Sequence, residues 1–361
     1  MSNIFQNDRL TGGLEPLWLP WEGRAPRIIL ASSCVMRRNL DGILFPPFQG
    51  KEEQARYVFE MIKNALSNHP EYDFLLRMQI TDLSPYLKHL FNFIGLAPIE
   101  FLSAADYRAI CMTPDYHAVL RINDRDHLTV MKSASGLSIN ELTAETNDIV
   151  TSYGMDLTYA RDDYFGYLCS KAEHCGTGFS ATVYMNLPAT ILMGYAEQIA
   201  NAAEEIGFNL SYVQKQKQSF VTHIATVTAA NLPHCSPMQI SARLNDFARR
   251  LEKHELDSRA KLLSNKESLT NLQDIIGRSL GLIAGSCKLS TREAVKALCI
   301  LWAGTEFGIR NFSITRKNYF KLLTTMMLQD KIEEEKLQDT PISITPEERA
   351  TLLKTTLKLM V

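Results

Sequence analysis

The sequence predicts an α+β protein in which a mixed part of strands and helices is followed by a small all-helical domain. Two observations lead to this prediction. β-rich runs alternate with amphipathic segments up to about residue 262, and only helical patterns occur from Leu269 onward. The length of 361 residues suits about two domains. We therefore divide the chain into a lead-in segment (1–26), a mixed domain (27–262) and a C-terminal helical domain (263–361).

The first half of the mixed domain is predicted to hold a strand, a helix and a hairpin. The apolar run Ile28–Ala31 is typical of a buried strand. Apolar residues at helical spacing predict an amphipathic helix over Lys51–Leu66. Tyr116–Ile122 and His127–Met131 read as two strands, joined by the charged turn formers Asn123–Asp126.

Further elements are predicted in the second half from periodicity and from helix-capping residues. Pro188 suits the first turn of a helix and Gly207 suits its C-terminal end. Ser236 followed by Pro237 marks another helix start. The predicted elements are a helix over Ile139–Tyr153, a strand over Phe179–Met185, a helix from Leu187 to about Ile206, strands at Tyr212–Val213 and Val221–Thr228, and a long helix from Ser236.

Composition is that of an ordinary soluble globular protein, with 45% hydrophobic and 22% charged residues. The net charge of -2 gives no reason to expect a nucleic acid or an anionic membrane as partner. The seven cysteines are odd in number and form no CxxC pair, so we expect reduced thiols and predict no metal site. Met1–Leu19 has no signal-peptide run, and Leu187–Met193 is far too short for a membrane span. We expect a cytoplasmic protein.

Four segments resemble, in order and spacing, the signature blocks of the ATP:guanidino phosphotransferases, which include the phosphagen kinases and the bacterial protein-arginine kinases. The third segment, with Gly-Tyr-Leu at its start and Gly-Thr-Gly near its end, is the most specific. Gly277–Gly281 and Glu306–Gly308 are similar to the helical domain of the bacterial enzymes. The resemblance covers residues 27–361 and implies an antiparallel sheet flanked by helices in the catalytic domain. The four segments are Ser32–Leu40, Asn123–Thr129, Gly166–Ala181 and Ile224–Leu263.

The reaction of that family moves the terminal phosphoryl group of ATP onto a guanidinium group. Several fixed cations must neutralise the phosphates, and arginine forks suit this task because they grip phosphate oxygens in pairs. A carboxylate must take the proton of the attacking guanidinium. The resemblance implies ATP and Mg²⁺ as cofactors if the chain is active, and none if it is not.

Most of the charged positions of the family are replaced in this sequence. The first block is one residue short, and the family's later Arg-Gly-x-x-Gly-Glu loop falls within Ser211–Phe220, which holds no Arg, Gly or Glu. One arginine clamp is worth about 10³–10⁵ in rate, so several losses predict inactivity. The replaced positions are Cys34, Met36, Thr129 and Ser180 for phosphate-binding arginines, Arg125 for the catalytic glutamate, and Lys171 for the reactive cysteine.

Some residues of the blocks remain candidates for nucleotide binding, and each also has a structural interpretation. Arg38 matches a family position, whereas Arg37 can only substitute from a shifted place. His127 can equally be a histidine of the core. The glycines can be present because a tight turn requires them, and the lysines can belong to a solvated loop. The candidates are Ser32, Ser33, Arg37, Arg38, His127, Lys171, Gly176, Thr177 and Gly178, with Lys215 and Lys217 as further cations.

Other side chains are open to two interpretations. Asp124 is the one carboxylate placed to replace the missing base, or it is a solvated loop acid. Cys169 and Cys175 are reactive thiols or inert ones. In the helical domain, the bacterial kinases read phosphoarginine with an Arg-Asp-x-x-Arg motif, of which only Arg349 survives here.

Two functional hypotheses follow. The first is a pseudokinase that binds a protein partner, by analogy a small zinc-binding activator-type protein; a homodimer is a further option. The second is a divergent active protein-arginine kinase with Asp124 as base and with Arg37, Arg38 and lysines as clamps.

Overall fold

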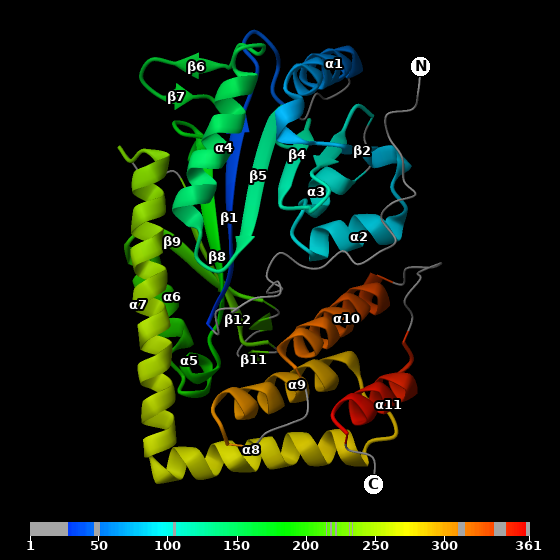
Figure 1. Ribbon diagram of the computed structural model, residues 1–361, viewed down its shortest axis with the longest axis vertical. Helices are drawn as coiled ribbons and strands as arrows, with labels where there is room; N and C mark the ends of the chain where they lie inside the picture. The colour runs from blue at the N-terminus through cyan, green and yellow to red at the C-terminus, as the bar shows by residue number, and fades with distance from the viewer. Residues whose placement is uncertain are drawn as a thin grey trace.

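The computed structural model describes residues 28–46, 51–103, 106–213, 215–216, 219–220, 222–230, 232, 234–309, 315–335 and 344–358. The predicted lead-in segment (1–26) and Lys217 lie outside these residues. The described chain forms one large sheet with helices packed on it, and a group of helices from the C-terminal part at one end (Figure 1). This confirms the predicted α+β class.

The large sheet has eight strands, and every neighbouring pair is antiparallel. In spatial order the strands are β2 (Leu76–Gln79), β3 (Ala109–Met112), β4 (Ala118–Ile122), β5 (Leu128–Ser135), β1 (Ile29–Arg38), β8 (Phe179–Asn186), β12 (Ile224–Ala230) and β9 (Phe208–Tyr212). Two small hairpins lie outside it, namely β6 (Arg161–Asp162) with β7 (Gly166–Tyr167), and β10 (Lys215–Gln216) with β11 (Ser219–Phe220).

The helices divide into those beside the sheet and those of the C-terminal part. The first group is α1 (Glu52–Asn68), α2 (Pro85–Phe93), α3 (Ile99–Leu102), α4 (Ile139–Tyr153), α5 (Pro188–Leu192), α6 (Ala196–Glu205) and α7 (Pro237–Ser264). The second group is α8 (Lys266–Gly285), α9 (Thr291–Glu306), α10 (Arg316–Glu335) and α11 (Pro346–Thr356). Short 3-10 turns are found at Pro70–Tyr72, Ile80–Asp82 and Ala172–His174.

Most predicted elements are confirmed, with two corrections. The predicted strand Ile28–Ala31 is the start of a longer strand, β1, which also carries the first signature block. The predicted helix from Leu187 to Ile206 is two helices, because Gly194 adopts the left-handed conformation (φ +77°) between α5 and α6. Ser236 starts α7 as predicted, and its side chain accepts a hydrogen bond from the backbone N–H of Gln239.

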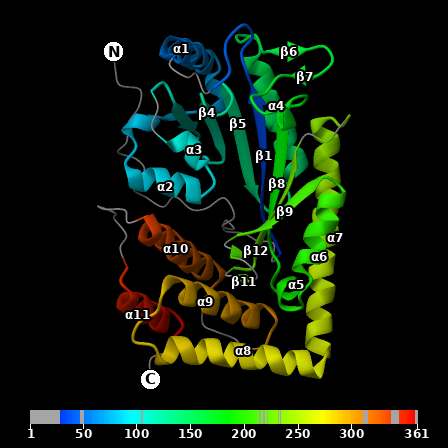
Figure 2. The same ribbon diagram turned by 180° about the vertical axis from the view of Figure 1, so that it is seen from behind.

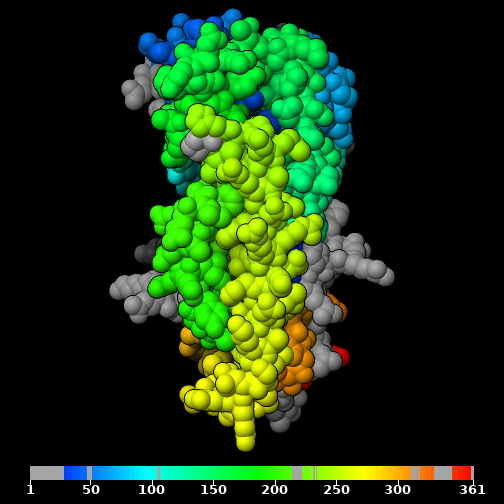
Figure 3. Space-filling view, turned by 90° about the vertical axis from the view of Figure 1, so that its left-hand side faces the viewer, coloured from blue at the N-terminus to red at the C-terminus, as the bar shows by residue number. Residues whose placement is uncertain are grey.

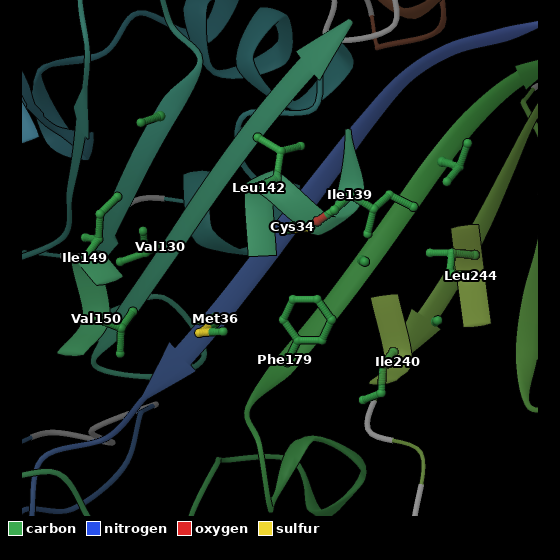
Figure 4. Close-up of a cluster of buried hydrophobic side chains, with 14 of the residues drawn as sticks. Cys34, Met36, Val130, Ile139, Leu142, Ile149, Val150, Phe179, Ile240 and Leu244 are labelled. Atoms are coloured by element: carbon green, nitrogen blue, oxygen red, sulfur yellow. Dashed lines mark hydrogen bonds between the residues drawn. The ribbon is translucent and has the colours of Figure 1, made fainter. Parts of the chain in front are cut away.

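One face of the large sheet packs into the main hydrophobic core. Cys34 and Met36 of β1 lie there beside Phe179 of β8, and helices α4 and α7 cover them with residues such as Leu142 and Leu244 (Figure 4). Alternate residues of a strand point to opposite faces, so the neighbours of these side chains face the other way. This second side, which we call the polar face, carries Ser33, Val35, Arg37, Arg121, Thr129, Ser133, Ser180, Thr182 and Thr228.

The C-terminal helices pack against one end of the sheet. Helix α7 runs along the molecule beside α5 and α6 and ends at the bend into α8 (Figure 3). Helix α10 contacts α2, and its Leu328 joins an apolar cluster with Met131 of β5 at the border of the polar face (Figure 2). The predicted domain boundary at residue 262 falls in the last turn of α7, and the division itself stays a prediction.

Candidate functional site

Arg37 lies at the centre of the polar face. Its register partner on β5 is Thr129, and its Nη1 donates a hydrogen bond to Ser180 Oγ on β8 at 3.0 Å. Burial lowers the pKa of Arg37, and the nearby Arg121 lowers it further, whereas Asp126 raises it. No carboxylate forms an ion pair with Arg37 among the described residues. The site therefore holds a desolvated cation that is only partly compensated.

Cys34 and Met36, which the first block sets at phosphate-binding arginine positions, do not reach this site. The Sγ of Cys34 lies 3.4 Å from Thr143 Oγ1 in the core, where burial raises the pKa of the thiol to about 12. Both side chains are fully buried on the core face, away from Arg37.

The side chains of β1 that do face the site beside Arg37 are Ser33 and Val35. The first block is one residue shorter than in the family. When it is aligned at Arg38, the two family arginines that are missing here fall on Ser33 and Val35, and not on Cys34 and Met36. Val35 was missed from the sequence, and Ser33 was named there only as a nucleotide-binding candidate, although the alternation of a strand that includes Arg37 would have revealed both as replaced arginine positions.

Thr129 and Ser180, which stand at replaced arginine positions of the blocks, flank Arg37 on its two neighbouring strands. Their side chains are buried and carry no charge. Ser32, in contrast, faces away from Arg37, and its hydroxyl donates to the carbonyl of Gly136 at 2.6 Å. The structure thus brings Ser33, Thr129 and Ser180 together with Arg37 and leaves Ser32 outside.

Arg38 is committed to structural contacts. Its Nη1 donates to the carbonyl oxygens of Arg37 at 2.7 Å and Thr177 at 2.9 Å. Its guanidinium lies 3.6 Å from the ring centroid of Tyr167, in a cation–π contact. The side chain holds the loop of the third block against β1.

The glycines of the third block are required by close backbone contacts. Gly178 has φ +65°, and a Cβ there would come within 2.4 Å of the carbonyl oxygen of Arg37. Gly176 lies against Gly166, where an added Cβ would be 2.7 Å from the Gly176 carbonyl oxygen. A side chain would collide with backbone at Gly166 and Gly178, and Gly176 has φ +107°, so these observations support the structural interpretation of the glycines.

His127 has the environment of a core histidine. Its Nδ1 accepts a hydrogen bond from the N–H of Leu40, and its Nε2 donates to the carbonyl of Leu44, both at 2.9 Å. Burial lowers its pKa to about 4. The neutral ring therefore joins the loop after β1 to the start of β5.

Asp124 is not a solvated loop acid, because its side chain is only 6% exposed. Its Oδ2 accepts a hydrogen bond from Arg121 Nε at 2.8 Å, and Arg121 Nη1 donates to the carbonyl of Leu96. Its Oδ1 has no hydrogen-bond partner within the part of the chain that the structure describes. Arg121 is a second arginine of the polar face that the signature blocks do not include; its place on the predicted strand Tyr116–Ile122 would have revealed it.

Arg125 and Lys171 bind acidic neighbours at the surface. Arg125 Nη2 lies 3.2 Å from Glu100 Oε1, and both side chains are exposed. Lys171 Nζ lies 3.0 Å from Glu173 Oε1, also in an exposed pair. Exposed pairs of this kind contribute little to stability, and neither of them joins Arg37 on the polar face.

The remaining candidates also lie away from Arg37 or are inert. Burial raises the pKa of Cys169 to about 12, which makes this thiol a poor nucleophile. Cys175 Sγ accepts a hydrogen bond from the backbone N–H of Cys169 at 3.3 Å. Only the backbone of Lys215 is described, as part of β10. Arg349 is buried and donates to the carbonyl oxygens of Leu289 and Ile344 at 2.7 and 3.1 Å. Its guanidinium ties α11 to the chain before α9.

The described helices include none that is long and apolar enough to cross a membrane. Within the same described residues, no group of three or more His, Cys, Asp or Glu side chains is arranged to hold a metal ion.

Comparisons with known proteins identify relatives of this chain. The family model described as "ATP:guanido phosphotransferase, C-terminal catalytic domain" matches residues 88–257. Protein-arginine kinases of Bacillus cereus (strain AH187) and Bacillus thuringiensis subsp. konkukian (strain 97-27) are each 25% identical over 299 residues, which cover 81% of this chain and 82% of theirs.

Solved structures of phosphagen kinases share the fold. The duplicated taurocyamine kinase of Schistosoma mansoni, with bound transition state analog components, has a TM-score of 0.56 and 15% identity over 74% of this chain. This chain spans 38% of that duplicated protein. Lombricine kinase has a TM-score of 0.56 and 16% identity, over 69% of this chain and 72% of its own. The chain is therefore similar to the ATP:guanido phosphotransferase catalytic domain over residues 88–257 and to protein-arginine kinases over most of its length.

Proposed function

We propose that this chain is a catalytically impaired member of the ATP:guanido phosphotransferase family, a pseudokinase that acts by binding a protein partner. One observation carries the proposal. Four uncharged residues surround Arg37 where the resemblance calls for phosphate-binding arginines, namely Ser33 and Val35 on β1, Thr129 on β5 and Ser180 on β8.

The charge on this face is too small for a triphosphate. Phosphoryl transfer spreads negative charge over several oxygens, and catalysis consists mostly of positioning and of stabilising that charge. Arg37 stands among hydroxyl groups, and Arg121 is already bound to Asp124. Losses of single clamps do not simply multiply, but several together leave no useful rate. Since the described residues do not fit Mg-ATP, the proposed role involves neither ATP nor Mg²⁺.

The position of the catalytic base supports the same proposal. Arg125 replaces the family's glutamate with the opposite charge and pairs with Glu100 at the surface. Asp124 Oδ2 already accepts a hydrogen bond from Arg121 Nε at 2.8 Å, so this oxygen is committed to a contact within the chain.

A divergent active protein-arginine kinase is the second candidate function. The observation that favours it is Asp124 Oδ1, which is buried and lacks a hydrogen-bond partner in the described structure. A substrate guanidinium would have to displace the groups that cover this oxygen in order to bind it. We favour the pseudokinase because this mechanism still lacks the phosphate clamps.

We further propose that the partner is a protein, by analogy a zinc-binding activator-type protein, and that the chain works in the cytoplasm. No disulfide joins the seven cysteines, all of which lie in described segments. Reduced thiols are usual in that compartment. A second copy of the chain is the other partner that we consider.

A phosphotransfer assay tests the proposal. The purified chain is incubated with γ-labelled Mg-ATP and an arginine-rich protein, with the Bacillus cereus protein-arginine kinase as positive control. We expect no acid-labile phosphoarginine above the level without enzyme. Acid-labile phosphoarginine above that level ends our proposal. Asp124→Ala and the surface control Glu100→Ala then test the second mechanism, and loss of label in the first variant alone supports Asp124 as the base.

A further inference from the structure

The β6–β7 hairpin carries two exposed aromatic side chains at its tip. Tyr164 is 88% exposed and Phe165 is 61% exposed, and their rings meet edge to face with centroids 4.9 Å apart. The hairpin projects from one end of the molecule, beside α4 (Figure 1). Aromatic side chains are enriched at protein interfaces, where each buries a large area and where a few anchor residues carry most of the binding energy.

The tip is held in one shape. A single carboxylate oxygen, Asp162 Oδ1, accepts hydrogen bonds from the backbone N–H groups of both Tyr164 and Phe165 at 2.8 Å. These two bonds also lower the pKa of Asp162. A tip that is ordered before binding loses little conformational entropy in a complex, so its aromatic rings act as ready anchors.

The base of the hairpin is anchored to the third signature block. Tyr167 exchanges two backbone hydrogen bonds of 2.9 Å with Gly176, and its ring lies on the guanidinium of Arg38. The base of the exposed tip is therefore tied to Gly176 and Arg38 of the catalytic-type fold.

The charge next to the rings defines the chemistry of the partner. Asp162 and the exposed Asp163 lie directly before Tyr164 and follow the exposed Arg161, so this segment has a net charge of -1 and a carboxylate is the charged group next to the aromatic pair. An anionic membrane surface would repel these carboxylates. A protein surface with an apolar pocket bordered by lysine or arginine complements both features.

We propose that the β6–β7 hairpin is the docking point for a protein partner whose surface has an apolar pocket bordered by lysine or arginine side chains. This inference rests on the proposed partner-binding function and adds to it the surface and the chemistry of the partner. Tyr164 and Phe165 fill the pocket, and Asp163 pairs with its border.

Photo-crosslinking in the organism's own cells tests the proposal with the full chain. Benzoylphenylalanine replaces Tyr164 in one version and Ile206, which is 50% exposed after α6, in the control. We expect one discrete protein to be captured from position 164 and not from 206. That protein is then purified and titrated calorimetrically with the unmodified chain, Phe165→Ala, Asp163→Lys and Ile206→Ala.

The expected result is a loss of affinity of about tenfold or more for Phe165→Ala and Asp163→Lys, with Ile206→Ala unchanged. Equal affinity of all four proteins, equal capture from both positions, or no capture overturns the proposal. Flotation of the chain with phosphatidylcholine–phosphatidylserine vesicles, abolished by Phe165→Ala, overturns it in favour of a membrane. Phosphoarginine formation by the unmodified chain would refute the impaired kinase alone and leave the docking result in place.

Discussion

Arg37 and Arg38 are neighbours in sequence but have opposite roles, and methionine substitutions separate them. Arg38→Met removes two hydrogen bonds from a charged donor, to the carbonyls of Arg37 and Thr177, and the contact with Tyr167. Such bonds contribute about 1.5–3 kcal/mol each. The cation–π contact adds about 2 kcal/mol when desolvated. Part of this loss is offset because the methionine side chain is buried in place of the arginine, so we expect the unfolding free energy to fall by roughly 3–5 kcal/mol.

Arg37→Met is the matched control at the next position. It removes a hydrogen bond to Ser180 at 3.0 Å and a long one to the carbonyl of Gly178 at 3.5 Å, together with a cation that burial already disfavours. We expect the unfolding free energy to stay within about 1 kcal/mol of the unmodified chain. Urea titration and scanning calorimetry measure both variants, and the Arg38 variant should melt at least 6 °C lower, at roughly 2–4 °C per kcal/mol. If the two variants melted alike, the assignment of Arg38 to a structural role would be refuted.

Three further predictions concern buried groups around the sheet. Glu255→Gln should lower the unfolding free energy in urea by about 3–5 kcal/mol, because this buried carboxylate accepts bonds from the chain at the start of α5 and from an arginine; a loss under 1 kcal/mol would contradict that reading. Gly178→Ala should cost more than Gly194→Ala, since both glycines have positive φ but only the first meets backbone; equal melting temperatures would argue against the close contact. His127 has a pKa lowered to about 4, so below pH 6.5 the unfolded chain binds a proton that the folded chain does not. Its contribution to the unfolding free energy should therefore fall by about 1.4 kcal/mol per pH unit from pH 6.5 to about 4, and His127→Gln should flatten the measured pH dependence over that range.

Local patterns predicted much of the fold because each has a direct physical cause. The capping residue at Ser236 and the apolar spacing of the helix over Ile139–Tyr153 fix those helices at their observed positions. The break at Gly194 was missed, because a glycine inside a helical pattern does not reveal its φ angle. Local sequence is enough to predict that a helix or strand is present, whereas a break inside a helix depends on how the chain packs.

The site shows a different limit of sequence reasoning. The loss of charged residues was visible in the signature blocks. The sequence analysis, however, assigned two replaced arginine positions to Cys34 and Met36, whereas the structure favours Ser33 and Val35. A one-residue deletion shifts every side chain of a strand to the other face, and only the strand pairing with β5 and β8 reveals the register. The burial of Asp124 depends on Arg121 and on the carbonyl of Leu96, which are contacts between separate elements.

The central claim is that the polar face no longer carries the cations to hold a triphosphate, and a calorimetric titration with Mg-ATP tests it most directly. The Bacillus cereus protein-arginine kinase serves as the binding control under the same conditions. We predict no saturable heat for this chain up to roughly 1 mM nucleotide, the upper end of ordinary enzyme affinities. Saturable one-to-one binding with a Kd in the micromolar range, reduced by Arg37→Met, would contradict the claim.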